Sequence, residues 1–159
     1  MNPRIGIGFD LHRLEPGNGF LVIGGVSIPH EKSLVGHSDG DVLLHAVTDA
    51  LLGACGLGNI GQIFPDTDPS FKGASSIPFL RKAGEMVRSQ GYRIGNIDSN
   101  ILAERPKLLL YFPQMQAKIA ETLELSVGQV SVKAKTMERV GIIGTEQAIA
   151  AEAVALVVK

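Results

Sequence analysis

The sequence of 159 residues is poor in features that mark several classes of protein: it has one cysteine, no tryptophan and no long apolar run. With Cys55 alone, no disulfide can form within the chain, so we expect a buried, inert thiol and a reducing compartment. A membrane-spanning helix needs about twenty consecutive apolar residues, and a signal peptide needs a basic segment before an apolar one. Neither pattern occurs, and the sequence predicts a soluble protein without a membrane segment.

A surplus of charge of one sign is also lacking. The 15 lysines and arginines nearly balance the 16 aspartates and glutamates, and the formal net charge at pH 7 is −1. Because there is no basic run, we do not expect the phosphate-backbone contacts of a nucleic-acid-binding protein, and a small-molecule ligand is favoured. The length corresponds to one domain, residues 1–159, that buries roughly two thirds of the surface of its unfolded chain.

The apolar residues repeat along the sequence with two different periods. Alternation predicts strands over residues 3–12, 20–29 with a break at Gly24 and Gly25, 92–104, 129–137 and 148–158. Apolar residues spaced by three and four predict helices over residues 38–55, 75–91 and 112–125. We expect Ser38 or Asp39 to be the N-cap of the first helix. Residues 64–73, with two prolines and a glycine, are typical of a loop.

This order of elements predicts an α+β fold, with one sheet covered on one face by helices. The second half reads as a β-α-β unit. The last strand, AIAAEAVALVV, is apolar on both of its faces, so its second face should also be covered. Since no helix remains for that face, we expect another subunit to pack there.

The most informative short motif is Asp-Leu-His at residues 10–12. Residues i and i+2 of a strand point to the same side, so Asp10 and His12 can converge on one metal ion. His45, on the first predicted helix, is the third candidate ligand, and Asp41 one turn before it could orient it or be an exposed charge. Two imidazoles, a carboxylate and one open position are typical of catalytic zinc. The alternative is that His12 belongs to a loop and His45 to the core.

Two further segments suggest phosphate binding. GHSDGD, with His37 and Ser38, lies at the predicted helix start, where backbone N–H groups favour an anion, and His37 would lie about 12 Å from His45 along the helix axis. A plain N-cap is the alternative. Near the C-terminus, Lys135 and Thr136 could hold phosphate, and Glu138 could join them only through magnesium or manganese. An ordinary charged turn is the alternative for that segment.

Six segments in this order closely resemble the 2-C-methyl-D-erythritol 2,4-cyclodiphosphate synthase family: IGIGFDLHRL, IGGVSIPHEKSLVGHSDGDVLLHAVTDALLGA, IGQIFPDTDPSFKGA, RPKLLLYFPQM, VSVKAKTMERVG and IAAEAVAL. The resemblance implies a ferredoxin-like mixed sheet covered by helices on one face. It also implies a homotrimer whose sheets line a central cavity, with active sites between adjacent subunits. The implied location is the bacterial cytoplasm, or a plastid stroma if a transit peptide was removed.

The resemblance assigns roles to particular residues. It makes Asp10, His12 and His45 the ligands of zinc or another divalent cation, and Glu138 the ligand of magnesium or manganese on the diphosphate. His37 and Thr136 would steady the phosphate under attack. The implied substrate contacts are Asp10, His12, Ser38, Asn59, Ile60, Gly61, Phe64, Pro65, Asp66, Thr67, Asp68, Ala103, Lys107, Leu108, Leu109, Lys135, Met137, Glu138, Ile142 and Thr145, with Ala103 and residues 107–109 forming a cytosine pocket.

The implied reaction is intramolecular. The 2-phosphate of a CDP-methylerythritol 2-phosphate substrate attacks the β-phosphorus, CMP leaves, and a cyclic diphosphate remains. A zinc phosphohydrolase would use the same residues with water as the nucleophile, and a non-catalytic trimeric ligand-binding protein would keep only the fold. Asn59, Lys135, Ile142 and Thr145 stand where many family members have Asp, Thr, Phe and Arg. That arginine binds isoprenoid diphosphates in relatives, so we do not expect tight binding of them here.

Overall fold

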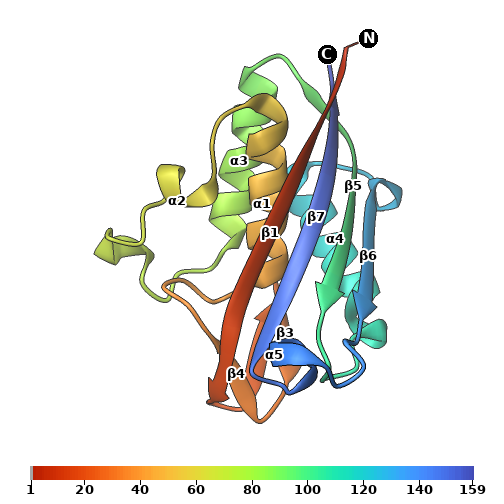
Figure 1. The fold of residues 1–159 in the computed structure, drawn as a ribbon. Coiled ribbons are helices and arrows are strands. Elements are labelled where there is room, and N and C mark those ends of the chain that lie inside the picture. The colour runs from red at the N-terminus through yellow and green to blue at the C-terminus, as the bar shows by residue number, and fades with distance from the viewer. Residues whose placement is uncertain (1) are drawn as a thin grey trace.

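The computed structural model describes residues 2–159, and its centre is a five-stranded mixed sheet (Figure 1). Across the sheet the strands are β4 (Lys32–Val35), β1 (Pro3–Pro16), β7 (Ala148–Val158), β5 (Arg93–Leu102) and β6 (Val130–Lys135). Neighbouring strands are antiparallel except β5 and β6, which are parallel. The two chain ends lie side by side because Pro3 pairs with Val158.

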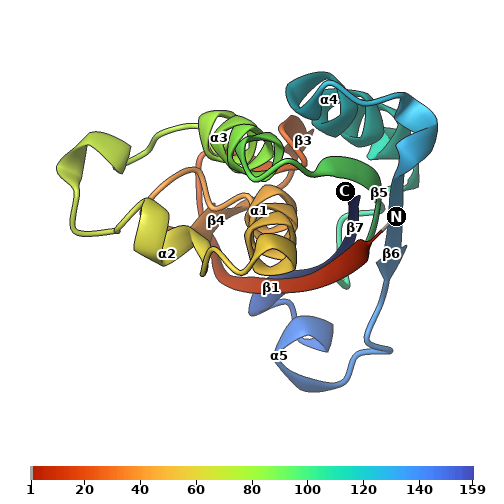
Figure 2. The ribbon, with the colours of Figure 1, turned by 90° about the horizontal axis from the view of Figure 1, so that it is seen from above.

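Three long helices cover one face of this sheet: α1 (Val42–Cys55), α3 (Ile77–Ser89) and α4 (Phe112–Leu123) (Figure 2). The shorter elements are the hairpin β2 (Phe20–Ile23) and β3 (Val26–Pro29), the helices α2 (Ile60–Ile63) and α5 (Gly141–Gly144), and 3₁₀ turns at Pro69–Phe71, Leu109–Tyr111 and Val127–Gln129. Within residues 2–159, no helix is long and apolar enough to cross a membrane. The predicted α+β layering is thus confirmed.

Helix α1 begins later than its N-cap prediction. Its N-cap is Asp41, whose side chain accepts a hydrogen bond from the Leu44 N–H, so the prediction of Ser38 or Asp39 was wrong. Asp39 does accept a hydrogen bond from a nearby backbone group, the Asp41 N–H, but that group lies before the helix begins. At the other end Gly56 adopts a left-handed conformation (φ +70°) and closes the helix.

Helix α1 packs unusually close to strand β1. Gly6 and Gly8 lie beneath it, and a Cβ atom added at Gly8 would stand 1.9 Å from the carbonyl oxygen of Ala46. The corresponding atom at Gly6 would stand 2.0 Å from the carbonyl oxygen of Ala50. Because alternate residues of a strand share a face, the next two side chains beneath α1 are those of Asp10 and His12. The glycines thus bring the helix backbone down to these polar residues.

The connections match a ferredoxin-like sheet only in part. Strands β1 and β5 run parallel to each other with β7 between them, which is the split crossover of that fold. Strands β5 and β6, joined through α4, are instead direct parallel neighbours. The ferredoxin-like expectation therefore holds for the first crossover and is corrected for the second.

The sheet face opposite the helices is open and apolar. Ile5, Ile7, Phe9 and Leu11 of β1 point to this side, and Ile5 and Ile7 are each 73% exposed. Val154 of the central strand β7 is 45% exposed on the same sheet. Isolated exposed apolar residues are ordinary, but a contiguous row of them marks a contact surface.

Candidate functional site

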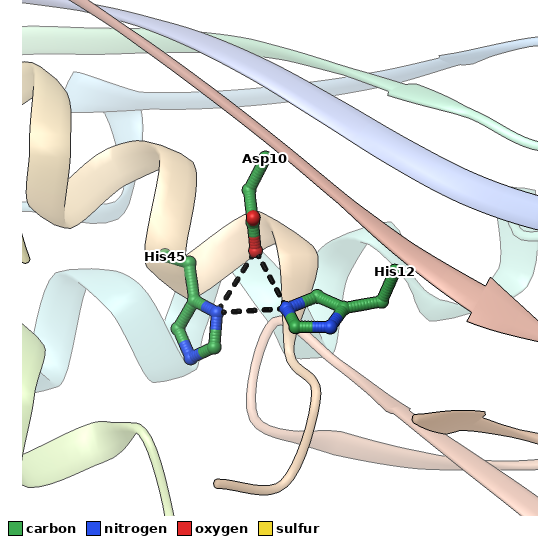
Figure 3. A group of neighbouring side chains, drawn as sticks. All are labelled: Asp10, His12 and His45. Atoms are coloured by element: carbon green, nitrogen blue, oxygen red, sulfur yellow. Dashed lines mark hydrogen bonds and ion pairs between the residues drawn. The ribbon is translucent and has the colours of Figure 1, made fainter. Parts of the chain in front are cut away.

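Three donor atoms converge where β1 passes beneath α1 (Figure 3). Asp10 Oδ2 lies 2.9 Å from His12 Nε2 and 2.9 Å from His45 Nδ1, and the two nitrogens are 3.3 Å apart. Asp10 and His12 come from the strand and His45 from the helix, as the spacing of the sequence predicted. The alternative reading, with His12 in a loop, is therefore wrong.

The tautomer of His12 suits a metal ligand. Its Nδ1–H donates a 2.7 Å hydrogen bond to the carbonyl oxygen of Val35, at the end of strand β4. In the neutral ring the proton is then on Nδ1, and the lone pair of Nε2 faces Asp10 and His45. A backbone acceptor on the far nitrogen is the usual way in which a ligating histidine is oriented.

The charges in this group favour a cation at its centre. Burial opposes ionisation of Asp10, but the hydrogen bonds that ring N–H groups of His12 and His45 donate when no cation is bound outweigh it and hold the pKa of Asp10 well below its ordinary value. Burial likewise opposes the charged form of His12, and the bond to Asp10 outweighs it, so the pKa of His12 is raised. One carboxylate oxygen and two imidazole nitrogens in this arrangement fit a divalent ion such as zinc.

Asp41 does not orient His45. Its carboxylate is fully buried and accepts hydrogen bonds from the N–H groups of Gly24, Gly25 and Leu44. The far nitrogen of His45, Nε2, instead lies 2.7 Å from Ser76 Oγ and 3.1 Å from Ser38 Oγ. Both interpretations of Asp41, as a residue that orients His45 and as an exposed charge, were wrong, because its side chain is buried and turns toward the β2–β3 hairpin.

The group of Asp10, His12 and His45 forms one wall of a pocket of about 340 Å³. Phe64, Phe71 and Phe79 form an apolar wall, with ring centroids 4.5 to 5.8 Å apart. The remaining lining residues are His37, Ser38, Ile60, Gly61 and Asp66. The pocket thus pairs a cation-binding side with an apolar side, as small-molecule sites commonly do.

His37 reaches this pocket from a loop and not from a helix. It lies five residues before the start of α1, so the prediction that it shares a helix with His45 was wrong. Its Nε2–H donates a 3.0 Å hydrogen bond to the carbonyl oxygen of Asp68, which ties it to the loop over residues 64–73. The N-terminus of α1 itself is occupied by the Asp41 carboxylate, which makes it unsuitable for a phosphate.

The segment with Asn59 is fixed by two local contacts. Asn59 is the N-cap of α2 and forms a reciprocal capping box with Gln62. The N–H of Ile60 donates a 2.6 Å hydrogen bond to Asp49, one turn after His45 on α1. Burial raises the pKa of Asp49, against the effect of that bond. Asp49 thereby joins the predicted substrate segment to the helix that carries His45.

Most of the other predicted site residues lie apart from this pocket, near the end of β6, in neighbouring loops and at the short helix α5. Thr136 Oγ1 donates a 2.7 Å hydrogen bond to Glu138, and the Ala103 N–H donates to the carbonyl oxygen of Lys135. Two strands separate β6 from β1, which is roughly 14 Å at the usual strand spacing. The members of this second group are Ala103, Lys107, Leu108, Leu109, Lys135, Thr136, Met137, Glu138, Ile142 and Thr145.

Sequence reasoning missed several residues around His45. Ser76 contacts His45 only because α3 packs near α1. Asp49 lies one turn after His45 on α1, but its hydrogen bond with Ile60 forms only because α2 packs near that helix. The sequence indicates Asp39 only as a candidate N-cap, because its hydrogen bonds with Ser76 join residues that are 37 positions apart. Phe71 and Phe79 carried no local signal beyond their apolar character.

Comparison with known proteins gives consistent similarities. A family model described as the YgbB family matches residues 3–158. The 2-C-methyl-D-erythritol 2,4-cyclodiphosphate synthase of Photorhabdus laumondii is 54% identical over 156 residues, which are 98% of this chain and 99% of the relative. The synthase of Serratia proteamaculans is 56% identical over 156 residues, again covering 98% and 99%.

Solved structures show the same likeness. The bifunctional IspDF of Campylobacter jejuni has a TM-score of 0.94 and 42% identity, covering 98% of this chain and 42% of its own. IspF of Plasmodium falciparum in complex with CDP has a TM-score of 0.86 and 35% identity, covering 98% and 96%. The present chain thus corresponds to less than half of the bifunctional protein and to nearly all of the other.

Proposed function

The chain belongs to the YgbB family, and from that membership we propose that its pocket catalyses the reaction of a 2-C-methyl-D-erythritol 2,4-cyclodiphosphate synthase. It converts 4-diphosphocytidyl-2-C-methyl-D-erythritol 2-phosphate to 2-C-methyl-D-erythritol 2,4-cyclodiphosphate and CMP, in the non-mevalonate isoprenoid pathway. The observation that carries the proposal is the convergence of Asp10, His12 and His45 at the edge of one pocket. The CDP complex of the Plasmodium relative supports a cytidine nucleotide as part of the substrate.

The bond changes need little covalent help from the protein. An oxygen of the substrate's 2-phosphate forms a bond to the β-phosphorus, the bond from that phosphorus to the bridging oxygen breaks, and CMP leaves with that oxygen. The enzyme is therefore a phosphorus–oxygen lyase whose task is to fold the substrate, bring the two phosphates together and neutralise their charge. The apolar wall of phenylalanines helps to keep water from the phosphorus.

Asp10, His12 and His45 would hold zinc or another divalent cation, which when bound supplies positive charge to the phosphoryl oxygens. We propose that Glu138 holds magnesium or manganese on the diphosphate. His37 and Thr136 steady the phosphate under attack, from the two separate groups of the site. Ser38 and the loop 64–68 contact the methylerythritol phosphate end, and residues 103 and 107–109 contact the cytosine. Residues 59–61 make a further contact with the substrate.

The two groups come together, in this proposal, in a homotrimer with a central cavity. Two features of one subunit support it. Strand β1, which carries Asp10 and His12, and strand β6, which ends at Lys135, are separated by two strands, roughly 14 Å, which suits a site shared between neighbouring subunits. The row of exposed apolar side chains on the open sheet face supplies a surface for the contact.

Oxygen-18 water separates cyclisation from hydrolysis. With the CDP-methylerythritol 2-phosphate substrate, we expect one CMP per cyclic diphosphate and no label in either product, since no water oxygen enters the new bond. A phosphohydrolase would place labelled oxygen in one of the products. Label in the products during turnover, or CMP released without a cyclic diphosphate, would reject the synthase activity in favour of the hydrolase.

A further inference from the structure

On the side of His45 that faces away from Asp10, Ser76 contacts the ring and Asp39 lies behind Ser76. His45 Nε2 lies 2.7 Å from Ser76 Oγ, and the Ser76 hydroxyl donates a 2.5 Å hydrogen bond to Asp39 Oδ1. We infer that Asp39 and Ser76 are positioning residues that fix the tautomer and direction of His45 for metal binding. The inference rests on the metal site proposed above and adds residues that do not touch the metal.

The hydrogen bonds among His45, Ser76 and Asp39 can be donated in one direction only, from His45 to Ser76 and from Ser76 to Asp39. A serine hydroxyl has one proton, and the Asp39 carboxylate can only accept it. Ser76 Oγ must then accept from His45, so the proton of the neutral imidazole is on Nε2. The lone pair of Nδ1 is left facing Asp10 Oδ2 and His12 Nε2. Carboxylates commonly orient ligating histidines at zinc sites, and here the Ser76 hydroxyl connects Asp39 to the ring.

Ser76 is held more firmly than a surface serine. Its side chain is completely buried, and both its N–H and its O–H donate to Asp39, at 2.9 and 2.5 Å. Ser76 is also the N-cap residue of α3, yet its hydroxyl makes no capping bond to that helix. An N-cap serine usually gives its oxygen to the helix N–H groups, so the hydroxyl here is committed to Asp39 and His45 instead.

Ser38 is the competing candidate for orienting His45, since its Oγ lies 3.1 Å from the same nitrogen. The bond to Ser76 is shorter, and Ser76 has the Asp39 carboxylate behind it, whereas Ser38 lines the pocket. A carboxylate behind the hydroxyl strengthens its capacity to accept from Nε2–H and makes Nδ1 a better donor to a cation. Ser38 therefore remains available to a substrate.

The test measures metal affinity in the full chain after removal of metal with a chelator. Ser76→Ala is expected to weaken zinc binding about 10- to 100-fold and to shift the visible absorption of the cobalt(II) form. Asp39→Asn keeps the shape and removes the charge, and should weaken zinc binding in the same direction. Ser76→Thr, which keeps the hydroxyl, should restore most of the affinity. Because Asp39 is argued to act through Ser76, the double variant Ser76→Ala/Asp39→Asn should lose little more zinc affinity than Ser76→Ala alone.

Ser75→Ala is the matched control, because it changes the exposed neighbouring serine, whose hydroxyl accepts from the Ile77 N–H and lies away from His45. It should leave zinc affinity and the cobalt spectrum unchanged. Wild-type zinc affinity and an unchanged cobalt spectrum in Ser76→Ala would overturn the inference and leave the proposed metal site standing. If Ser76→Ala does not fold, wild-type zinc affinity and an unchanged cobalt spectrum in Asp39→Asn would overturn the inference. A wild-type chain that binds neither metal would overturn the proposed metal site and this inference together.

Discussion

Asp41 shows how one buried carboxylate can link two elements of this fold. It caps α1 at Leu44 and also accepts hydrogen bonds from Gly24 and Gly25 at the turn between β2 and β3. Burial raises the pKa of Asp41 to about 6, and these three backbone bonds oppose the rise only in part. The residue therefore holds the hairpin against the helix while remaining a titratable group in the interior.

The pH dependence of stability follows from that shift. The folded chain binds the proton of Asp41 more tightly than the unfolded chain, whose pKa is near 3.8. The stability from this group is therefore fully present below about pH 4 and is lost as the pH rises to about 6. Asp41→Asn keeps an acceptor oxygen and removes the titration.

We expect the free energy of unfolding of wild type, relative to Asp41→Asn, to fall between about pH 4 and 6 and to be flat on either side. Urea unfolding at a series of pH values measures it. Asp66→Asn, an exposed Asp-to-Asn change, is the control. Parallel curves for wild type and Asp41→Asn across the whole range would contradict the prediction.

At the scale of single elements, the contact of α1 with β1 sets the spacing of the proposed ligands. Gly8 lies directly beneath the carbonyl oxygen of Ala46, the residue after His45. Backbone atoms meet there without side chains between them. The distance from His45 to Asp10 is therefore determined by the approach of helix and strand, and not by adjustable packing.

Gly8→Ala should move α1 away from β1, because the new methyl group would stand 1.9 Å from the Ala46 oxygen. We expect a loss of about 1–3 kcal/mol in stability from overpacking, together with weaker zinc binding. Denaturant unfolding and zinc titration measure the two effects. Gly128→Ala, with nothing within 4 Å of the added carbon, serves as the control. Unchanged zinc affinity in Gly8→Ala would show that the helix approach does not set the ligand spacing.

The elements that the sequence predicted are those with a long internal pattern. Helices α1, α3 and α4 and strands β1, β5, β6 and β7 all appear near their expected places, as does the β2–β3 hairpin. Strand β4 was missed because its four residues are stabilised by pairing with the end of β1, which no local pattern reveals. The short helices α2 and α5 were missed for a similar reason: one turn of helix has no periodicity to detect.

The site residues also differ in whether a local sequence pattern could predict them. Asp10 and His12 could be paired from the sequence because i and i+2 share a strand face. His45 could be added because its helix was clear. Ser76 could not, since its contact with His45 exists only after α3 packs beside α1, 31 residues along the chain. Tertiary packing alone decides which polar groups stand behind the ligands.

At the scale of the whole molecule, the separation of the two residue groups predicts complementation between inactive variants. His45→Ala removes a residue of the first group and Glu138→Ala a residue of the second. If each site combines groups from adjacent subunits of a trimer, about a quarter of the sites in a random mixture contain both intact groups. Unfolding and refolding the two variants together should therefore restore partial activity, measured as CMP release.

The control replaces the Glu138→Ala partner by the double variant His45→Ala/Glu138→Ala, which should restore nothing, because every subunit then lacks His45. Light scattering of the wild-type chain gives the oligomeric state independently. A monomer in solution, or activity that stays absent in every mixture while each variant is folded, would reject the shared site.

Strand β1 finally has a consequence for how this chain can vary. From Ile5 to His12 its residues alternate between the face that carries the close helix contact and the proposed ligands and the open apolar face. Substitutions of the helix-facing residues are limited by steric fit and metal chemistry. Substitutions on the open face are limited by the hydrophobic surface that a neighbouring subunit would cover. A library of random substitutions should therefore find hardly any silent position in this strand, including those that look exposed in a single subunit.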